Sequence, residues 1–216
     1  MSSFLKKLLK NKKSDLNNYS PYVKLNDNEC SKLLGDRIEF KLWSAQRHLD
    51  KLIEIENKYG GIMGENKIYA EDELDCYFAQ IIGARDALLM LINQKLGLNL
   101  SEQNVLLKTI RDKLDSQQKR YIIKELDALD DDKTSWYSIL NEFRNKSIHR
   151  SILNKMAKVG LHDNINNNTS SSNVKNYFLM PTDYKDSMDK EITEFLTDCI
   201  KEMLELIRTI KKNAGI

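Results

Sequence analysis

Apolar residues recur at three- and four-residue steps along four separate stretches of the chain. This spacing gathers apolar side chains on one face of a helix, whereas a strand would need strict alternation. The stretches span residues 29–59, 71–96, 136–159 and 186–211. Only 8 glycines and 2 prolines occur among 216 residues, so helices of this length meet few breakers. The pattern predicts an all-α, up-and-down helical bundle of about four long helices plus short accessory helices.

Charge and patterning divide the chain into two parts. The first thirteen residues carry five lysines and no acid, and residues 1–28 are therefore expected to form a basic N-terminal helix or tail and a linker. Residues 29–216 form the predicted bundle domain, with Gly97 and Gly160 ending its second and third long helices. An Asn- and Ser-rich stretch at about 162–183 is expected to be a flexible loop, either a mobile insertion or a flap beside a site.

Composition excludes several classes of function. The net charge of +2 neither demands nor excludes a nucleic-acid partner. Three well-separated cysteines without a Cys-x-x-Cys pair indicate free thiols in a reducing cytoplasm, and they predict neither a disulfide framework nor a metal site. No apolar run reaches membrane-spanning length, and no glycine-rich phosphate loop, Gly-x-Ser-x-Gly or His-Glu-x-x-His motif occurs. No cofactor is therefore predicted.

One polar segment interrupts the third predicted helix and carries the candidate catalytic residues Arg144, Asn145 and His149. Asn145 and His149 lie four residues apart, which places them on one helix face. Arg offers a fixed fork of donors for a phosphate, and His exchanges a proton near neutral pH. Because this set contains no pair of carboxylates, it suits phosphodiester cleavage in RNA, where His removes the 2′-OH proton and Arg stabilises the charged phosphorane.

Simpler interpretations of the same residues stay open. An Arg, Asn and His cluster on a surface helix is often only a hydrogen-bonded polar patch. Lys146 and Arg150 contact an RNA backbone in one interpretation and are solvated charges in the other. Arg85 and Asp86 interrupt the apolar face of the second long helix. Asp86 could pair with the motif helix through Arg144 or His149, or the two could form a purely structural ion pair.

The Arg, Asn and His spacing resembles the signature of the HEPN superfamily (higher eukaryote and prokaryote nucleotide-binding domains). In that signature four to six residues separate an Arg, commonly followed by Asn, from a His, and an Arg often follows the His, as Arg150 does here. The aromatic and small residues at 77–88 resemble the helix that precedes the motif in many bacterial members. The resemblance spans roughly residues 30–213 and is closest to the bacterial HEPN branch named after a Clostridium thermocellum protein.

The resemblance implies a homodimer in which two motif helices face a shared basic cleft. Many HEPN proteins are metal-independent endoribonucleases of toxin–antitoxin or phage-defence systems, so RNA is the implied substrate and a separately encoded antitoxin an implied partner. The resemblance implies that His149 transfers the proton and that Arg144 binds the phosphate. It implies that Asn145 either orients the imidazole or binds a phosphate or sugar oxygen. The alternative implied by the same family is a non-catalytic dimeric module that binds RNA, a nucleotide or a protein.

Overall fold

The computed structural model describes residues 26–59, 62, 67–117, 119–127, 129, 135–149, 155–164, 169–178 and 189–215. For residues 147–149, 155–164 and 169–174 this description covers the backbone alone. The N-terminal tail predicted for 1–28 lies outside the described residues up to position 25. Helices make up most of the described chain, and the helical bundle predicted from the apolar pattern is confirmed.

The first predicted long helix is two helices, α2 (Asp27–Gly35) and α3 (Arg37–Tyr59). Asp36 between them is extended, with φ −111° and ψ 101°. Its carboxylate oxygen accepts hydrogen bonds from the backbone N–H of Ile38 and Glu39 at 3.0 and 3.1 Å. An Asp side chain favours a helix N-terminus because it satisfies donors that the first turn leaves unpaired. The expectation of one uninterrupted helix was therefore wrong at this residue.

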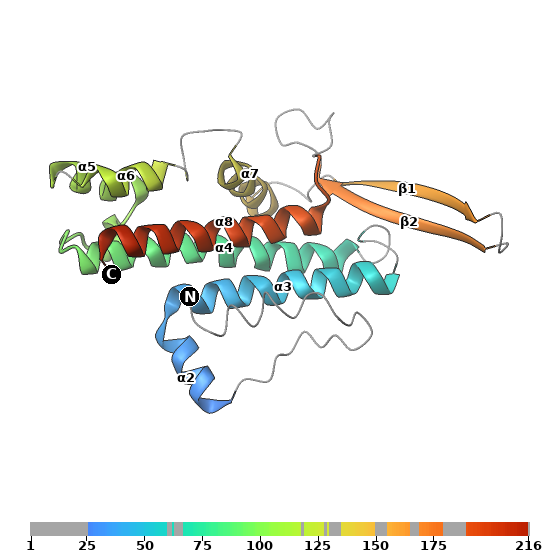
Figure 1. Cartoon of the computed structure of the whole chain (residues 1–216), viewed down its shortest axis with the longest axis horizontal. Helices are drawn as coiled ribbons and strands as arrows, with labels where there is room; N and C mark the ends of the chain where they lie inside the picture. The colour runs from blue at the N-terminus through green and yellow to red at the C-terminus, as the bar shows by residue number, and fades with distance from the viewer. Residues whose placement is uncertain are drawn as a thin grey trace.

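Helix α4 (Lys67–Lys95) is the centre of the bundle. It packs on α3 and α8 (Ile192–Ala214), and the three run side by side along the long axis of the molecule (Figure 1). The Tyr77 hydroxyl, fully buried, donates a 2.5 Å hydrogen bond to the carbonyl oxygen of Leu196 and so joins α4 to α8. Gly97 has a φ of +62°, which confirms its predicted place at the end of the second long helix.

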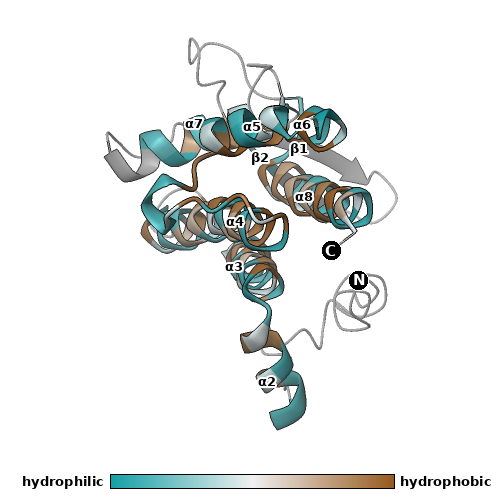
Figure 2. Ribbon diagram, turned by 90° about the vertical axis from the view of Figure 1, so that its left-hand side faces the viewer, coloured by the Kyte–Doolittle hydropathy of each residue, from teal (hydrophilic) through white to brown (hydrophobic). Residues whose placement is uncertain are grey.

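A layer of shorter helices covers one side of α4 and α8 (Figure 2). It contains η4 (Glu102–Asn104), α5 (Leu107–Ser116), α6 (Arg120–Asp127) and α7 (Trp136–His149). Their apolar faces turn inward, and the side chains that α5 and α6 bury are Leu107, Ile110, Leu114, Ile122 and Leu126. Figures 1 and 2 together show that α7 crosses α4 and α8 instead of running along them.

The third long helix predicted for 136–159 is shorter than expected, because α7 ends at His149. Strand β1 (Lys155–Asn164) follows, and it pairs antiparallel with β2 (Thr169–Phe178). The strand β2 occupies part of the stretch predicted as a flexible loop at 162–183; the rest of that stretch, outside the strands, falls outside the described residues. This two-stranded hairpin projects beyond the bundle near the start of α8 (Figure 1).

Two physical reasons favour the hairpin over a longer helix. Ser, Thr and Asn, which dominate β2, are poor helix formers because their side chains compete for backbone hydrogen bonds. The end of β2 also enters the core, where Phe178 is fully buried and Asn176 donates a 2.5 Å hydrogen bond to Glu56 of α3. Tertiary contacts at the base of the hairpin therefore prevail over the local three- and four-residue spacing that suggested a helix.

Candidate functional site on helix α7

The N-terminus of α7 is capped by Ser135. Its Oγ accepts a 3.2 Å hydrogen bond from the backbone N–H of Ser138, and its carbonyl oxygen accepts one from Ile139. Such a cap satisfies a donor of the first helical turn. Helix α7 therefore begins directly after a serine cap.

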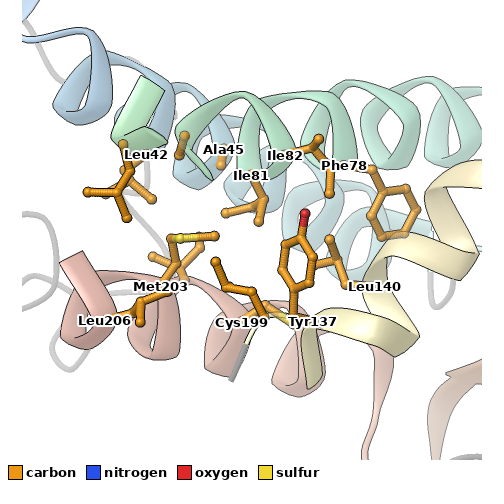
Figure 3. Packing of buried hydrophobic residues seen from close by; sticks show 14 of the residues in the cluster. Leu42, Ala45, Phe78, Ile81, Ile82, Tyr137, Leu140, Cys199, Met203 and Leu206 are labelled. Atoms are coloured by element: carbon orange, nitrogen blue, oxygen red, sulfur yellow. The ribbon is translucent and has the colours of Figure 1, made fainter. Parts of the chain in front are cut away.

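The buried face of α7 fixes the helix against α4. Tyr137 and Leu140 lie opposite Ile81, Ile82 and the ring of Phe78, and the Tyr137 hydroxyl oxygen points toward α4 (Figure 3). Tyr137 is 2% exposed and Leu140 is fully buried. Burial of this kind leaves the opposite face of α7 as its polar face.

Phe143, directly before Arg144, belongs to an aromatic cluster that joins four elements. Its ring centroid lies 4.5 Å from that of Phe178 in β2, 6.4 Å from that of Phe78 in α4 and 6.2 Å from that of Phe195 in α8. The base of the hairpin is thereby held against the turn of α7 that carries Arg144. Large aromatic rings contribute most of the packing energy in clusters of this size, so this turn is held in place from several sides.

Arg144 and Asn145, two of the three predicted catalytic residues, contact each other through their side chains. The guanidinium Nη1 of Arg144 donates a 3.0 Å hydrogen bond to Oδ1 of Asn145. The Arg144 Nε is buried and finds no hydrogen-bond partner among the described residues. A guanidinium has five N–H donors, of which the contacts among the described residues use one, and such donors suit an anion.

The other predicted residues of the motif are His149, Arg150 and Lys146. His149 is the last residue of α7, where its backbone stands one turn after Asn145 on the same face, but its side chain lies outside the described residues. Arg150 falls outside them altogether. Lys146 is described, and its Nζ lies 3.3 Å from Oε1 of Glu142.

A depression of about 290 Å³ lies along the polar face of α7, and we call it the α7 groove. The described residues that line it are Ser138, Asn141, Glu142, Asn145 and Lys146. Ser138, Asn141 and Glu142 were not predicted as site residues. Their sequence signal was their spacing, since positions three, four and seven residues before Asn145 share its helix face.

Arg85 and Asp86 are adjacent residues of α4. Arg85 bonds to the neighbouring carboxylate of Asp86 at 2.7 Å, and its Cζ lies 5.6 Å from the ring centroid of Tyr137, at the start of α7. Burial alone would lower the pKa of Arg85, but Tyr137 and Asp86 outweigh burial and raise it. Among the described side chains, Arg144 bonds to Asn145 and Asp86 bonds to Arg85, which agrees with the alternative that Arg85 and Asp86 form an ion pair with each other. A pair with His149 falls on a side chain outside the description.

The described part of the chain offers little else that could hold a cofactor. No three His, Cys, Asp or Glu side chains in it gather as ligands of a metal ion would. The three cysteines are free thiols. In the same residues, none of the helices has the length and apolar character needed to cross a bilayer.

Comparison with known proteins adds a family to this geometry. A family model described as Cthe2314-like HEPN matches residues 74–211, from the first half of α4 to near the end of α8, and it includes all of α7. No match was found among curated proteins or among solved structures. Because the matched segment covers more than half of the chain, this protein belongs to the Cthe2314-like HEPN family.

Proposed function

We propose that this protein is a metal-independent endoribonuclease of the HEPN type, with its active site on α7. The observation that supports this most directly is the state of Arg144. Its guanidinium is oriented by Asn145, while its buried Nε finds no partner among the described residues. A guanidinium that a neighbouring amide already orients is suited to bind an anion such as a phosphodiester through its terminal N–H groups. Family membership makes RNA the anion to test first.

In the proposed reaction, His149 takes the proton of a ribose 2′-OH, and the 2′-oxygen forms a bond to the adjacent phosphorus. Arg144 donates hydrogen bonds to the phosphorane oxygens, where negative charge develops. The bond from phosphorus to the 5′-oxygen then breaks, and that oxygen receives a proton. The products are an RNA ending in a 2′,3′-cyclic phosphate and an RNA beginning with a 5′-OH.

A homodimer supplies the second proton-transfer group. Base and acid must act on opposite sides of the phosphorus, and one chain has a single His149. Two α7 helices facing each other across a shared cleft would bring two such histidines to one phosphate. Lys146 and Arg150 would then contact the RNA backbone on either side. A role in a toxin–antitoxin or phage-defence system, with a separately encoded antitoxin, is part of the same proposal.

The decisive experiment incubates purified protein with total and transfer RNA in EDTA. Wild type is compared with His149→Ala, Arg144→Ala and, as a matched control, Arg120→Ala, whose side chain is 84% exposed on α6. We expect wild type and the Arg120 variant to cut RNA and leave 2′,3′-cyclic phosphate ends, and both α7 variants to be at least 100-fold slower, because each removes a group that acts in the transition state.

Other results would decide against catalysis. If wild type leaves RNA intact but binds it, and Arg144→Ala weakens that binding, the protein is a binding module. If cleavage persists in both α7 variants, the activity belongs to another site or to a contaminant. If RNA is neither cut nor bound, the polar residues of α7 are structural.

A further inference from the structure

The α7 groove contains the carboxylate of Glu142, and this carboxylate would repel an RNA phosphate bound in the groove. Glu142 is the sole acidic residue in the sequence of α7, and its side chain is 48% exposed. It stands three residues before Asn145, so the Cα atoms of the two residues are about 4.5 Å apart along the helix axis. A carboxylate so close to a phosphate site lowers the affinity for the backbone unless it faces a different part of the nucleotide.

The neighbours of Glu142 suit a nucleobase better than a phosphate. Lys146 lies 3.3 Å from Oε1 and partly neutralises the carboxylate, and this contact leaves Oε2 without a described partner. Ser138, Asn141 and Asn145 add uncharged hydroxyl and carboxamide groups to the same groove. Groups of this kind can hydrogen-bond to base edges, and unlike Arg or Lys they bring no positive charge that would offset the repulsion between Glu142 and a phosphate.

We infer that the α7 groove binds the base next to the scissile phosphate and selects a base with an exocyclic amino group over uracil. A carboxylate only accepts hydrogen bonds, and the amino groups of cytosine, adenine and guanine are donors that it can reach at the base edge. In uracil the same edge presents carbonyl oxygens on both sides of its single N–H, and these repel the carboxylate. The inference rests on the proposed ribonuclease function, because it assigns a base preference to that same site.

A second depression lies on helix α8 and serves as a control site for the α7 groove. Lys201, Glu202, Leu204, Glu205 and Arg208 line it. Arg208 bonds to Glu205 at 3.1 Å, a carboxylate–cation pair within one helix like that of Glu142 and Lys146. This depression holds an apolar side chain and no carboxamide, so Glu205 serves as a matched control for Glu142.

The test compares poly(C) with poly(U), two pyrimidine polymers that differ mainly in the 4-amino and 4-oxo groups. Cleavage rates are measured for wild type, Glu142→Gln and Glu205→Gln. We expect wild type to cut poly(C) about tenfold faster than poly(U), the ratio that one well-made base contact gives. Glu142→Gln should bring that ratio close to one, because a carboxamide both donates and accepts, while Glu205→Gln should keep the wild-type ratio.

Equal cleavage of the two polymers by wild type, or a preference for poly(U), would overturn the inference and leave the ribonuclease function standing. The same holds if Glu142→Gln keeps a tenfold ratio, since another group would then read the base. A His149→Ala protein provides a second readout, because its relative affinity for the two polymers must follow the same order. If neither polymer nor total RNA is cut or bound, the ribonuclease function fails and this inference fails with it.

Discussion

The contact between Phe143 and Phe178 gives a direct test of how the fold positions α7. The two ring centroids are 4.5 Å apart, and the residues are 2% and 0% exposed. Replacing a buried Phe with Ala costs about 3–5 kcal/mol, from lost burial and the cavity that remains. We therefore expect Phe143→Ala and Phe178→Ala each to lower the free energy of unfolding by about 4 kcal/mol. The double variant should lose about 1 kcal/mol less than the sum, because both single variants remove the same ring contact.

Urea denaturation followed by far-ultraviolet circular dichroism measures these changes. A domain of this size is stable by about 5–15 kcal/mol, so the double Ala variant risks unfolding outright. Phe143→Leu and Phe178→Leu keep much of the volume, should cost less than about 2 kcal/mol each, and allow the same cycle. Losses that add within about 0.3 kcal/mol would show that the rings do not interact. A cost below about 1 kcal/mol for Phe178→Ala would show that β2 does not enter the core.

Three further substitutions test other parts of the structure by the same urea assay. Tyr77→Phe should lower the free energy of unfolding by about 1 kcal/mol, because the buried hydrogen bond to the Leu196 carbonyl is lost. Gly83→Ala should raise the free energy of unfolding by about 0.5 kcal/mol, because a Gly within a helix loses more conformational entropy on folding than Ala does. The added Cβ would meet only the end of the flexible Lys41 side chain, at 2.9 Å, and a loss of stability would contradict this prediction. Burial raises the pKa of Glu56 above its ordinary value of 4.5, so the folded protein holds this proton more tightly than the unfolded chain, and the stability linked to it falls as pH rises through the raised pKa. Glu56→Gln should therefore flatten the decline in stability above pH 4.5, and an unchanged pH profile would refute the assignment.

The long helices were predictable because their signal is local. Helices α4 and α8 bury a continuous apolar face, and their observed starts lie within about six residues of the predicted ones. The break at Asp36 was missed because the apolar spacing continues across it. The residue type of Asp36 was nevertheless a signal for a helix start at this position, because Asp is a favoured N-cap residue.

The hairpin could not be predicted from local spacing. Met156 and Val159 continue the apolar spacing of the preceding helix, and this spacing alone does not distinguish a helix from a strand. The deciding contacts are distant in sequence: Val159 is the register partner of Val174, and Asn176 bonds to Glu56. Contacts between residues so far apart in the chain are the part of a fold that is hardest to predict from a single sequence.

The candidate site was located by residue type, but its surroundings depend on tertiary structure. Arg144 and Asn145 were chosen as an Arg and an Asn at a helical break, and the structure adds the hydrogen bond between them. The contact of Arg85 with Tyr137 joins α4 to α7, so no pattern within either helix predicts it. The groove residue Glu142 was overlooked because a single charged residue on a helix surface is normally a solvated one.

The early end of α7 changes the electrostatics of the candidate site. A helix running to residue 159 would have placed the motif in mid-helix, whereas Arg144 to His149 are the last six residues of α7. The last turn of a helix carries a partial negative charge, which favours cations and disfavours a phosphate. An anion can bind there only if local cations outweigh the helix terminus, and Arg144 and Lys146 stand within that turn or next to it. In the proposed complex the two cations have to offset both the helix end and Glu142, and we expect the affinity for RNA to fall as salt concentration rises.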